Sequence, residues 1–343
     1  MRSVAVMRPG KTEVVDIARP EPGPYEALVR TECSFICNAT DRKIMDGHFP
    51  GIGPEQYPLL LGHESVGIVE AVGERVSAFK PGQRVIGGLL LDPPDKRFGS
   101  AWGGNSDYVI ALDYSALVSD GREADEVFKI MRTVPDDIPP EAAGLLCTFR
   151  EVYAGFSDFR FTGKERIVIF GAGPVGLSFV RFARLKGFPY IASVDPIAEK
   201  RQLALSMGAD AAYSPDDDIE GAFAREAGGK ADAVIDAVGH EAIINRALGM
   251  VRMAGSICVY GVVSTETISL AKHRGPYNFN LFVHQWPTRD AEAAAQEPLC
   301  DWIRSGQLDW RPFVSGRYPV EEYETAAAAT KKPGAVKTLI TYN

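Results

Sequence analysis

The chain has 343 residues, which is long enough for two domains with separate hydrophobic cores. Its 45% hydrophobic and 24% charged residues are typical of globular proteins, and its net charge of −8 argues against nucleic acid and anionic membranes as partners. No apolar run reaches the ~18 residues of a membrane helix, and five cysteines are too few for a disulfide framework, which favours a reducing, cytoplasmic location.

The first 150 residues predict a compact β structure. Short apolar runs alternate with turn signals such as Pro9-Gly10 and Pro81-Gly82, a pattern typical of a barrel or sandwich. The predicted strands are Ser3–Met7, Glu26–Thr31, Gly67–Val72, Gln83–Ile86 and Asp107–Ala111. Helical spacing of apolar residues begins over Pro140–Tyr153.

From residue 166 onward, strand and helix patterns alternate, which predicts a doubly wound parallel sheet of the α/β class. In chain order the predicted elements are strand 167–170, helix 174–186, strand 190–194, helix 198–207, strand 211–213, helix 219–227, strand 233–236, helix 241–251 and strand 256–260. The tail returns to mixed elements: a helical region over 287–310, then strands 313–318 and 336–341 around a helix over 320–330.

A glycine-rich turn follows the first strand of this alternating region. Gly171, Gly173 and Gly176 form a G-x-G-x-x-G array between a strand and a helix, with Asp195 at the end of the next strand. The glycines allow a tight turn, close approach of a pyrophosphate, and close helix–strand packing. The alternative is an ordinary βαβ turn with a surface aspartate.

Other residues of the same region extend the expected cofactor site. Pro174 and Val175 open the helix, where free N–H groups favour phosphates. A carboxylate at Asp195 favours NAD over NADP, although Arg201 lies close enough to keep NADP as the second choice. Val238 and Gly261 follow later strands of the sheet, where contacts to the nicotinamide half are expected.

Four scattered residues could bind a metal. Cys37, His63, Glu64 and Cys147 each lie near a predicted loop or element end. Thiolate, imidazole and carboxylate donors suit zinc, and three protein ligands with an exchangeable position would make the site catalytic. The alternative is that the histidine packs in the interior and the cysteines are inert core residues.

The chain resembles zinc-dependent alcohol and polyol dehydrogenases of the medium-chain dehydrogenase/reductase superfamily. The motifs that carry the resemblance are Gly62-His63-Glu64 with Gly67, the segment 67–85, Leu145-Leu146-Cys147 with Tyr153, and the nucleotide motif. The resemblance implies a GroES-like β-barrel catalytic domain over 1–152 and 306–343. It also implies a doubly wound Rossmann NAD-binding domain over 153–305 and a cleft between the two.

Three departures from the family pattern bear on the chemistry. The segment Cys37-Asn38-Ala39-Thr40-Asp41 has one residue more than the usual motif, so either Cys37 or Asn38 occupies the first ligand position, with Cys37 favoured. Residues 88–112 contain no cysteine, so we expect no structural zinc. Lys43 stands where many relatives carry a proton-relay histidine, which leaves Thr40 to begin proton transfer and Lys43, His48 or water to continue it.

The resemblance therefore implies a zinc-dependent oxidoreductase that transfers hydride between NAD and a secondary alcohol, polyol, sugar or cyclitol. We expect one catalytic zinc per subunit, which polarises the alcohol oxygen. A zinc-free NAD(P)H reductase acting on a quinone or enone, and a dinucleotide-binding protein without turnover, are the alternatives. By family analogy we expect a homodimer or homotetramer, with the predicted strand Ser256–Tyr260 as an exposed sheet edge.

Overall fold

The computed structural model describes residues 1–263 and 265–342 and divides the chain into two compact units. The first unit contains residues 1–148 and 289–343, of which Asn343 lies outside the described residues. The second unit contains residues 149–288, so the division falls inside helix α3 (Pro140–Asp158). Among the described residues no helix is both long enough and apolar enough to cross a membrane.

The chain returns to the first unit earlier than the sequence suggested. The expected boundary was residue 306, whereas the structure places it at Arg289. The reason is that the helical region 289–304 bonds to the first unit: Gln296 donates to the carbonyl of Thr133, and Arg304 pairs with Asp137. This region forms α8 (Arg289–Ala294) and α9 (Gln296–Arg304).

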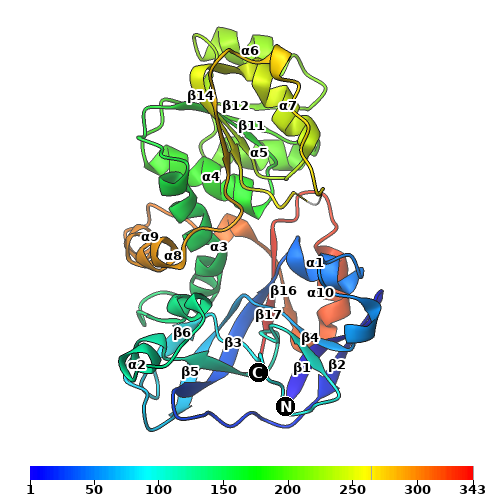
Figure 1. Ribbon diagram of the computed structural model, residues 1–343, viewed down its shortest axis with the longest axis vertical. Helices are drawn as coiled ribbons and strands as arrows, with labels where there is room; N and C mark the ends of the chain where they lie inside the picture. The colour runs from blue at the N-terminus through cyan, green and yellow to red at the C-terminus, as the bar shows by residue number, and fades with distance from the viewer. Residues whose placement is uncertain (264, 343) are drawn as a thin grey trace. The chain divides into compact units, whose positions relative to one another are not determined.

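Two sheets form the framework of the first unit (Figure 1). One has the order β2-β1-β4-β7, and the other has the order β16-β17-β3-β5-β6-β9 with β8 paired to β3. The strands are β1 (Arg2–Arg8), β2 (Lys11–Asp16), β3 (Glu26–Ile36), β4 (Leu59–Leu61), β5 (Ser65–Val72), β6 (Arg84–Ile86), β7 (Gly99–Ala101), β8 (Tyr108–Leu112), β9 (Arg132–Val134), β16 (Val314–Pro319) and β17 (Lys337–Thr341). The short helices are α1 (Thr40–Met45), α2 (Tyr114–Ser119) and α10 (Tyr323–Ala329).

Strand β3 is the central strand of the larger sheet in the first unit. Most of its residues are buried, among them Val29 and Phe35, and it pairs with β5, β8 and β17. Apolar side chains on the inner faces, among them Val4, Ile36 and Ile340, are fully buried. Because β3 is paired on both sides, the residues that follow its end are held in a fixed position.

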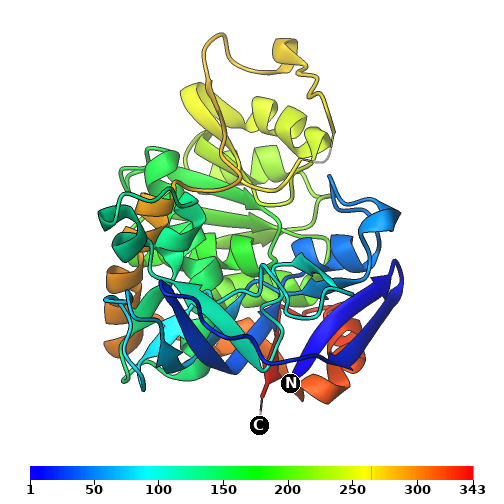
Figure 2. The ribbon, with the colours of Figure 1, turned by 60° about the horizontal axis from the view of Figure 1, so that its bottom comes forward.

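The second unit is a six-stranded parallel sheet in the order β12-β11-β10-β13-β14-β15, with helices on both faces (Figure 2). Its strands are β10 (Arg166–Phe170), β11 (Tyr190–Val194), β12 (Ala211–Tyr213), β13 (Ala231–Asp236), β14 (Val251–Val259) and β15 (Asn280–Val283). Its helices are α4 (Pro174–Leu185), α5 (Ala198–Met207), α6 (Ile219–Glu226) and α7 (Glu241–Met250). The order reverses between β10 and β13, and ligands of such sheets bind at the carboxyl ends of strands at this point.

The edge of this sheet is not the strand expected from the sequence. The predicted strand 256–260 belongs to β14, which is covered by β13 on one side and by β15 on the other. The edge is β15, a strand that sequence patterning missed because Asn280, Leu281 and Val283 are all exposed and show no apolar alternation. An exposed edge strand presents unpaired backbone groups to a partner.

Candidate metal centre and cofactor site

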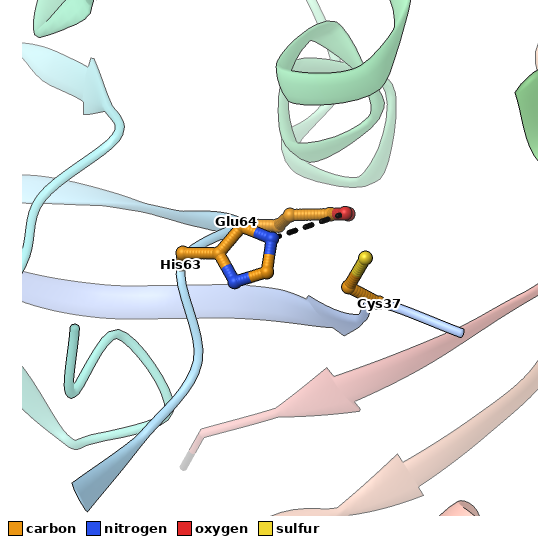
Figure 3. A group of neighbouring side chains, drawn as sticks. All are labelled: Cys37, His63 and Glu64. Carbon is orange, nitrogen blue, oxygen red and sulfur yellow. Dashed lines mark ion pairs between the residues drawn. The ribbon is translucent and has the colours of Figure 1, made fainter. Parts of the chain in front are cut away.

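Three of the four expected metal ligands converge at one end of β3 (Figure 3). Ser34 of β3 pairs with Ser65 of β5, and the N–H of Phe35 donates to the carbonyl of Glu64 at 3.0 Å. This antiparallel register places Cys37, which directly follows β3, next to the start of β5. The ligand atoms of Cys37, His63 and Glu64 therefore lie within 4.8 Å of one another.

The thiol of Cys37, rather than the amide of Asn38, faces His63 and Glu64. The Asn38 amide donates to the carbonyl of Val336 at 3.1 Å, which ties it to the segment before β17. The Sγ atom of Cys37 accepts the N–H of Thr40 at 3.5 Å, a contact that ties the thiol to the start of α1. The extra residue of this loop is thus accommodated without moving the cysteine away from the histidine.

The imidazole of His63 has an acidic neighbour at each ring nitrogen. Its Nε2 lies 3.9 Å from Oε1 of Glu64, and its Nδ1 lies 3.3 Å from Oδ1 of the fully buried Asp41. Burial lowers the pKa of His63, but Asp41 and Cys37 outweigh it and raise that pKa well above its usual value. Metal-binding histidines are commonly oriented by a carboxylate at their second nitrogen. Asp41 has this position, although the sequence did not identify it as a site residue.

A buried lysine neutralises Glu64. Lys337 is 3% exposed, Glu64 is 5% exposed, and the lysine Nζ contacts both carboxylate oxygens. Because Thr338 of β17 pairs with Ile36 of β3, Lys337 lies across from Cys37. Burial lowers the pKa of Lys337, but Glu64 and Cys37 outweigh it and raise that pKa above its usual value. Sequence reasoning missed Lys337, whose one signal was a charge inside the apolar run 335–340.

Cys147 approaches the same centre from α3. Gly144 packs against the ring of Phe35 and the thiol of Cys33, so that α3 lies directly on β3 and Cys147 follows one turn later. Cys147 is not part of the group within 4.8 Å, but its charge, like that of Cys37, raises the pKa of Lys337. Cys33 is a core residue, because its thiol donates to the carbonyl of Pro140 and burial raises its pKa.

The expected proton-transfer residues lie on and after α1. Thr40 begins this helix, and Lys43 follows one turn later on the same face. Both side chains are half-buried, whereas His48 is exposed. The structure places Thr40 beside Cys37 through its backbone N–H.

The donor set of this centre fits zinc. Thiolate and imidazole are the ligands that zinc prefers, and Cys37 and His63 supply both within one short distance. Asp41 lies beside Nδ1 of His63, and the Glu64 carboxylate is paired with Lys337. Among the described residues, the side chains grouped closely enough to hold an ion are therefore Cys37, His63 and Glu64.

The glycines of the nucleotide motif have the geometries that a dinucleotide site needs. Gly171 follows β10 with φ of +93°, a left-handed conformation that favours glycine. A Cβ at Gly173 would meet nothing within 4 Å, so its face is open to an approaching ligand. A Cβ at Gly176 would lie 1.7 Å from the carbonyl oxygen of Gly171, so only glycine lets α4 pack there. Pro174 and Val175 begin α4, whose first N–H groups lack intrahelical acceptors.

The Asp195 carboxylate is hydrogen-bonded to the backbone of the glycine turn. Its two carboxylate oxygens accept the N–H groups of Ala172 at 2.8 Å and Ile197 at 2.9 Å. Arg201 donates to the carbonyls of Asp195 and Pro196, which places its guanidinium along the same backbone. Each carboxylate oxygen retains acceptor capacity for a ribose hydroxyl.

The carboxyl ends of β13 and β14 complete this region. Asp236 accepts N–H groups from Val238, Gly239 and His240, and burial raises its pKa. Val238 is 52% exposed at the point where the strand order reverses. Gly261 approaches the Gly239 backbone so closely that a Cβ would lie 2.1 Å from its nitrogen.

Comparisons with known proteins show which family the two parts of the chain match. Residues 23–118 match the alcohol dehydrogenase GroES-like domain, and residues 174–283 match the zinc-binding dehydrogenase domain. The chain is 31% identical to an NADP-dependent isopropanol dehydrogenase of Thermoanaerobacter brockii over 75% of its length and 74% of that protein. It is 27% identical to an alcohol dehydrogenase of Cupriavidus necator over 99% of its length and 98% of that protein.

Solved structures show the same fold. A chain from E. coli CFT073, described as a short chain alcohol dehydrogenase complexed with NADH, superposes with a TM-score of 0.80 at 21% identity. The superposition covers 100% of this chain and 99% of that one. The combination of a GroES-like domain and a Rossmann-type domain, expected from the sequence, is confirmed.

Proposed function

The chain belongs to the zinc-binding alcohol and polyol dehydrogenases of the medium-chain dehydrogenase/reductase superfamily, and on this premise we propose that it interconverts a secondary alcohol or polyol and its ketone, with NAD as hydride carrier and one zinc ion per subunit. The observation that carries the proposal is the convergence of Cys37, His63 and Glu64 beside the buried Lys337.

The chain's own residues define the electrostatics of the proposed reaction. Zinc held by Cys37, His63 and Cys147 would supply Lewis acidity that lowers the pKa of an alcohol hydroxyl. Asp41 lies beside Nδ1 of the His63 ring, and Nε2 faces Glu64. Lys337 keeps the Glu64 carboxylate neutralised in a buried setting. Thr40 is the proposed first acceptor of the hydroxyl proton, with Lys43 one turn further along α1.

We propose NAD rather than NADP as the preferred cofactor. The support is the Asp195 carboxylate beside the glycine turn, whose negative charge would repel a 2′-phosphate. Val238, half-exposed at the carboxyl end of β13, offers an apolar surface to the nicotinamide half. The ratio of kcat/KM with NAD to that with NADP tests this preference, and a ratio below one would contradict it.

Two glycine variants separate cofactor binding from folding. Gly173→Ala should leave the free energy of unfolding within about 0.5 kcal/mol of wild type, because the new methyl group meets no protein atom. The same methyl group should weaken NAD binding about tenfold or more, because it occupies the space that a pyrophosphate needs. Gly176→Ala should destabilise the fold by about 1–3 kcal/mol or more, because its Cβ overlaps the Gly171 carbonyl.

The measurements are titration calorimetry with NAD and urea unfolding of both variants. Wild-type affinity in Gly173→Ala would show that the glycine turn does not approach the cofactor. Wild-type stability in Gly176→Ala would show that the close packing of α4 on Gly171 is not required.

The proposed function as a whole is tested on purified protein by metal analysis and by NADH formation with a panel of secondary alcohols. We expect about one zinc per chain and activity that a chelator removes and zinc restores. Protein without zinc whose activity survives the chelator would favour the zinc-free reductase, and zinc-loaded protein that turns over no alcohol would favour binding without catalysis.

We also propose that the enzyme is a homodimer, or a homotetramer built from two such dimers, in the cytoplasm. The support for self-association is the β15 edge, where Leu281 is 37% exposed and Val283 is 47% exposed. The support for the location is the pair of thiols at Cys37 and Cys147, which must stay reduced to bind zinc.

Lysine at both Leu281 and Val283 should convert the assembly to smaller species, because like charges would face each other across the paired edges. Light scattering coupled to size-exclusion chromatography measures the mass, with Met253→Lys on the neighbouring β14 as a control for added charge. An unchanged mass in the double variant would contradict the β15 interface.

A further inference from the structure

Trp102 has a backbone conformation that is unusual for a bulky residue. Its φ is +68°, and among the described residues only Arg160 and Ala254 share a positive φ without being glycine. Its carbonyl accepts the N–H of Leu90 at 2.7 Å, and its backbone bridges to Leu61 of β4. These contacts fix the left-handed turn, which glycine would adopt without strain. The turn therefore gives no reason for an indole, and the reason must be sought in what the ring contacts.

The indole contacts the candidate metal ligand. Its centroid lies 5.3 Å from the His63 ring with an interplanar angle of 61°, and 5.8 Å from the Phe49 ring with an angle of 84°. Phe49 follows α1, so a segment far from Trp102 in the sequence packs a second aromatic ring against the indole. An alcohol whose hydroxyl lies at the Cys37–His63 centre would meet these rings with its substituents.

The half-buried Trp102 side chain also borders a hollow of about 570 Å³, within the size range of small-molecule sites. The hollow is lined by Leu89, Leu91, Trp102, Asp125, Glu126, Val127 and Arg289. Its charged residues already have partners. Asp125 accepts the N–H of Val127, Glu126 pairs with Lys129, and Arg289 pairs with Glu292. The hollow therefore combines leucine, valine and indole side chains with charged groups that are already paired.

We propose that Trp102 is a specificity-determining residue, and that the enzyme acts on secondary alcohols, or the matching ketones, that carry an aryl substituent. This inference rests on the proposed function and narrows its substrate class. An aryl ring would pack edge-to-face on the indole and on Phe49 and would be removed from water. Against these two rings, the hydroxyl groups of an open-chain polyol would lose water without gaining hydrogen bonds.

The test compares three substrates on the purified, zinc-loaded enzyme: 1-phenylethanol, 2-butanol and sorbitol. For wild type we expect kcat/KM to be at least about tenfold higher for 1-phenylethanol than for sorbitol. Trp102→Ala should lower kcat/KM for 1-phenylethanol about 10- to 100-fold while 2-butanol changes less than about threefold. Trp102→Phe, which keeps an aromatic ring, should retain most of the wild-type kcat/KM for 1-phenylethanol. Trp302→Ala in α9 is the matched control and should leave the substrate ratio unchanged.

A binding measurement without turnover complements the kinetics. Line broadening of the ¹⁹F NMR signal of 4-fluoroacetophenone reports binding to the zinc-loaded enzyme without NAD. We expect broadening with wild type and Trp102→Phe and its loss with Trp102→Ala, while zinc content stays the same. Trp102→Phe covers the case in which the alanine variant fails to fold: retained preference and broadening support the proposal, and loss of both with normal folding overturns it.

The outcomes distinguish this inference from the proposed function. A zinc-loaded enzyme that oxidises none of the three alcohols with NAD or NADP would contradict the proposed function itself. An active enzyme that prefers sorbitol, or a Trp102→Ala variant with the wild-type substrate ratio, would leave the proposed function standing and overturn the role of Trp102.

Discussion

Exchanging Cys37 for alanine is expected to lower kcat for alcohol oxidation about 10³-fold or more and to abolish tight zinc binding. The Sγ atom of Cys37 lies within 4.8 Å of the ligand atoms of His63 and Glu64 and is the sulfur donor of this group. Without it the proposed centre would keep one imidazole, the Cys147 thiol and a carboxylate already paired with Lys337, which is one sulfur donor too few for a three-ligand zinc site. Metal content and steady-state kinetics on the same preparation measure both effects.

Asn38→Ala is the matched control for this variant. Its amide donates to the carbonyl of Val336 and does not face His63, so alanine should cost about 1 kcal/mol of stability and leave zinc content unchanged. If Asn38→Ala lost zinc while Cys37→Ala retained it, the amide rather than the thiol would be the ligand, and the loop would have to rearrange on metal binding.

Replacing Lys337 by methionine is expected to destabilise the protein by about 3–5 kcal/mol, because it leaves the Glu64 carboxylate buried without the cation that contacts both of its oxygens. Both side chains are almost fully buried, so water cannot substitute for the ammonium group. Lys332→Met, at an exposed position five residues earlier, is the control for loss of a lysine charge. Denaturant unfolding of the metal-free protein provides the measurement.

The double variant Glu64→Gln with Lys337→Met should recover most of the lost stability, because the uncompensated charge is removed together with its partner. Strict additivity of the two single effects would mean that the two residues do not interact in solution. A Lys337→Met protein that unfolds at the wild-type denaturant concentration would show that Glu64 finds another partner.

Local patterns were sufficient for most of the second unit. Apolar periodicity and Gly208, which ends α5 with φ of +114°, defined that helix at the residues seen in the structure. The glycine motif predicted β10, its turn and α4, because each of these depends on neighbours within a few residues. Strand β15 escaped prediction since its position depends on pairing with β14 rather than on its own composition.

The candidate site was only partly predictable. Donor chemistry and family resemblance grouped Cys37, His63, Glu64 and Cys147, and the structure brings the first three within 4.8 Å of one another. Whether Cys37 or Asn38 faces the histidine depended on a hydrogen bond to Val336, almost 300 residues away. Lys337 reaches Glu64 for the same reason, since β17 pairs with β3. Contacts of this kind follow from strand register between remote segments, which no local pattern encodes.

X-ray absorption at the zinc edge, measured on the purified wild-type protein, tests the proposed centre most directly. We predict a first shell with two sulfur atoms at about 2.3 Å, from Cys37 and Cys147, and a nitrogen at about 2.0–2.1 Å from His63. A shell without sulfur, or protein that binds no zinc when zinc is supplied, would contradict a catalytic centre built on Cys37 and His63.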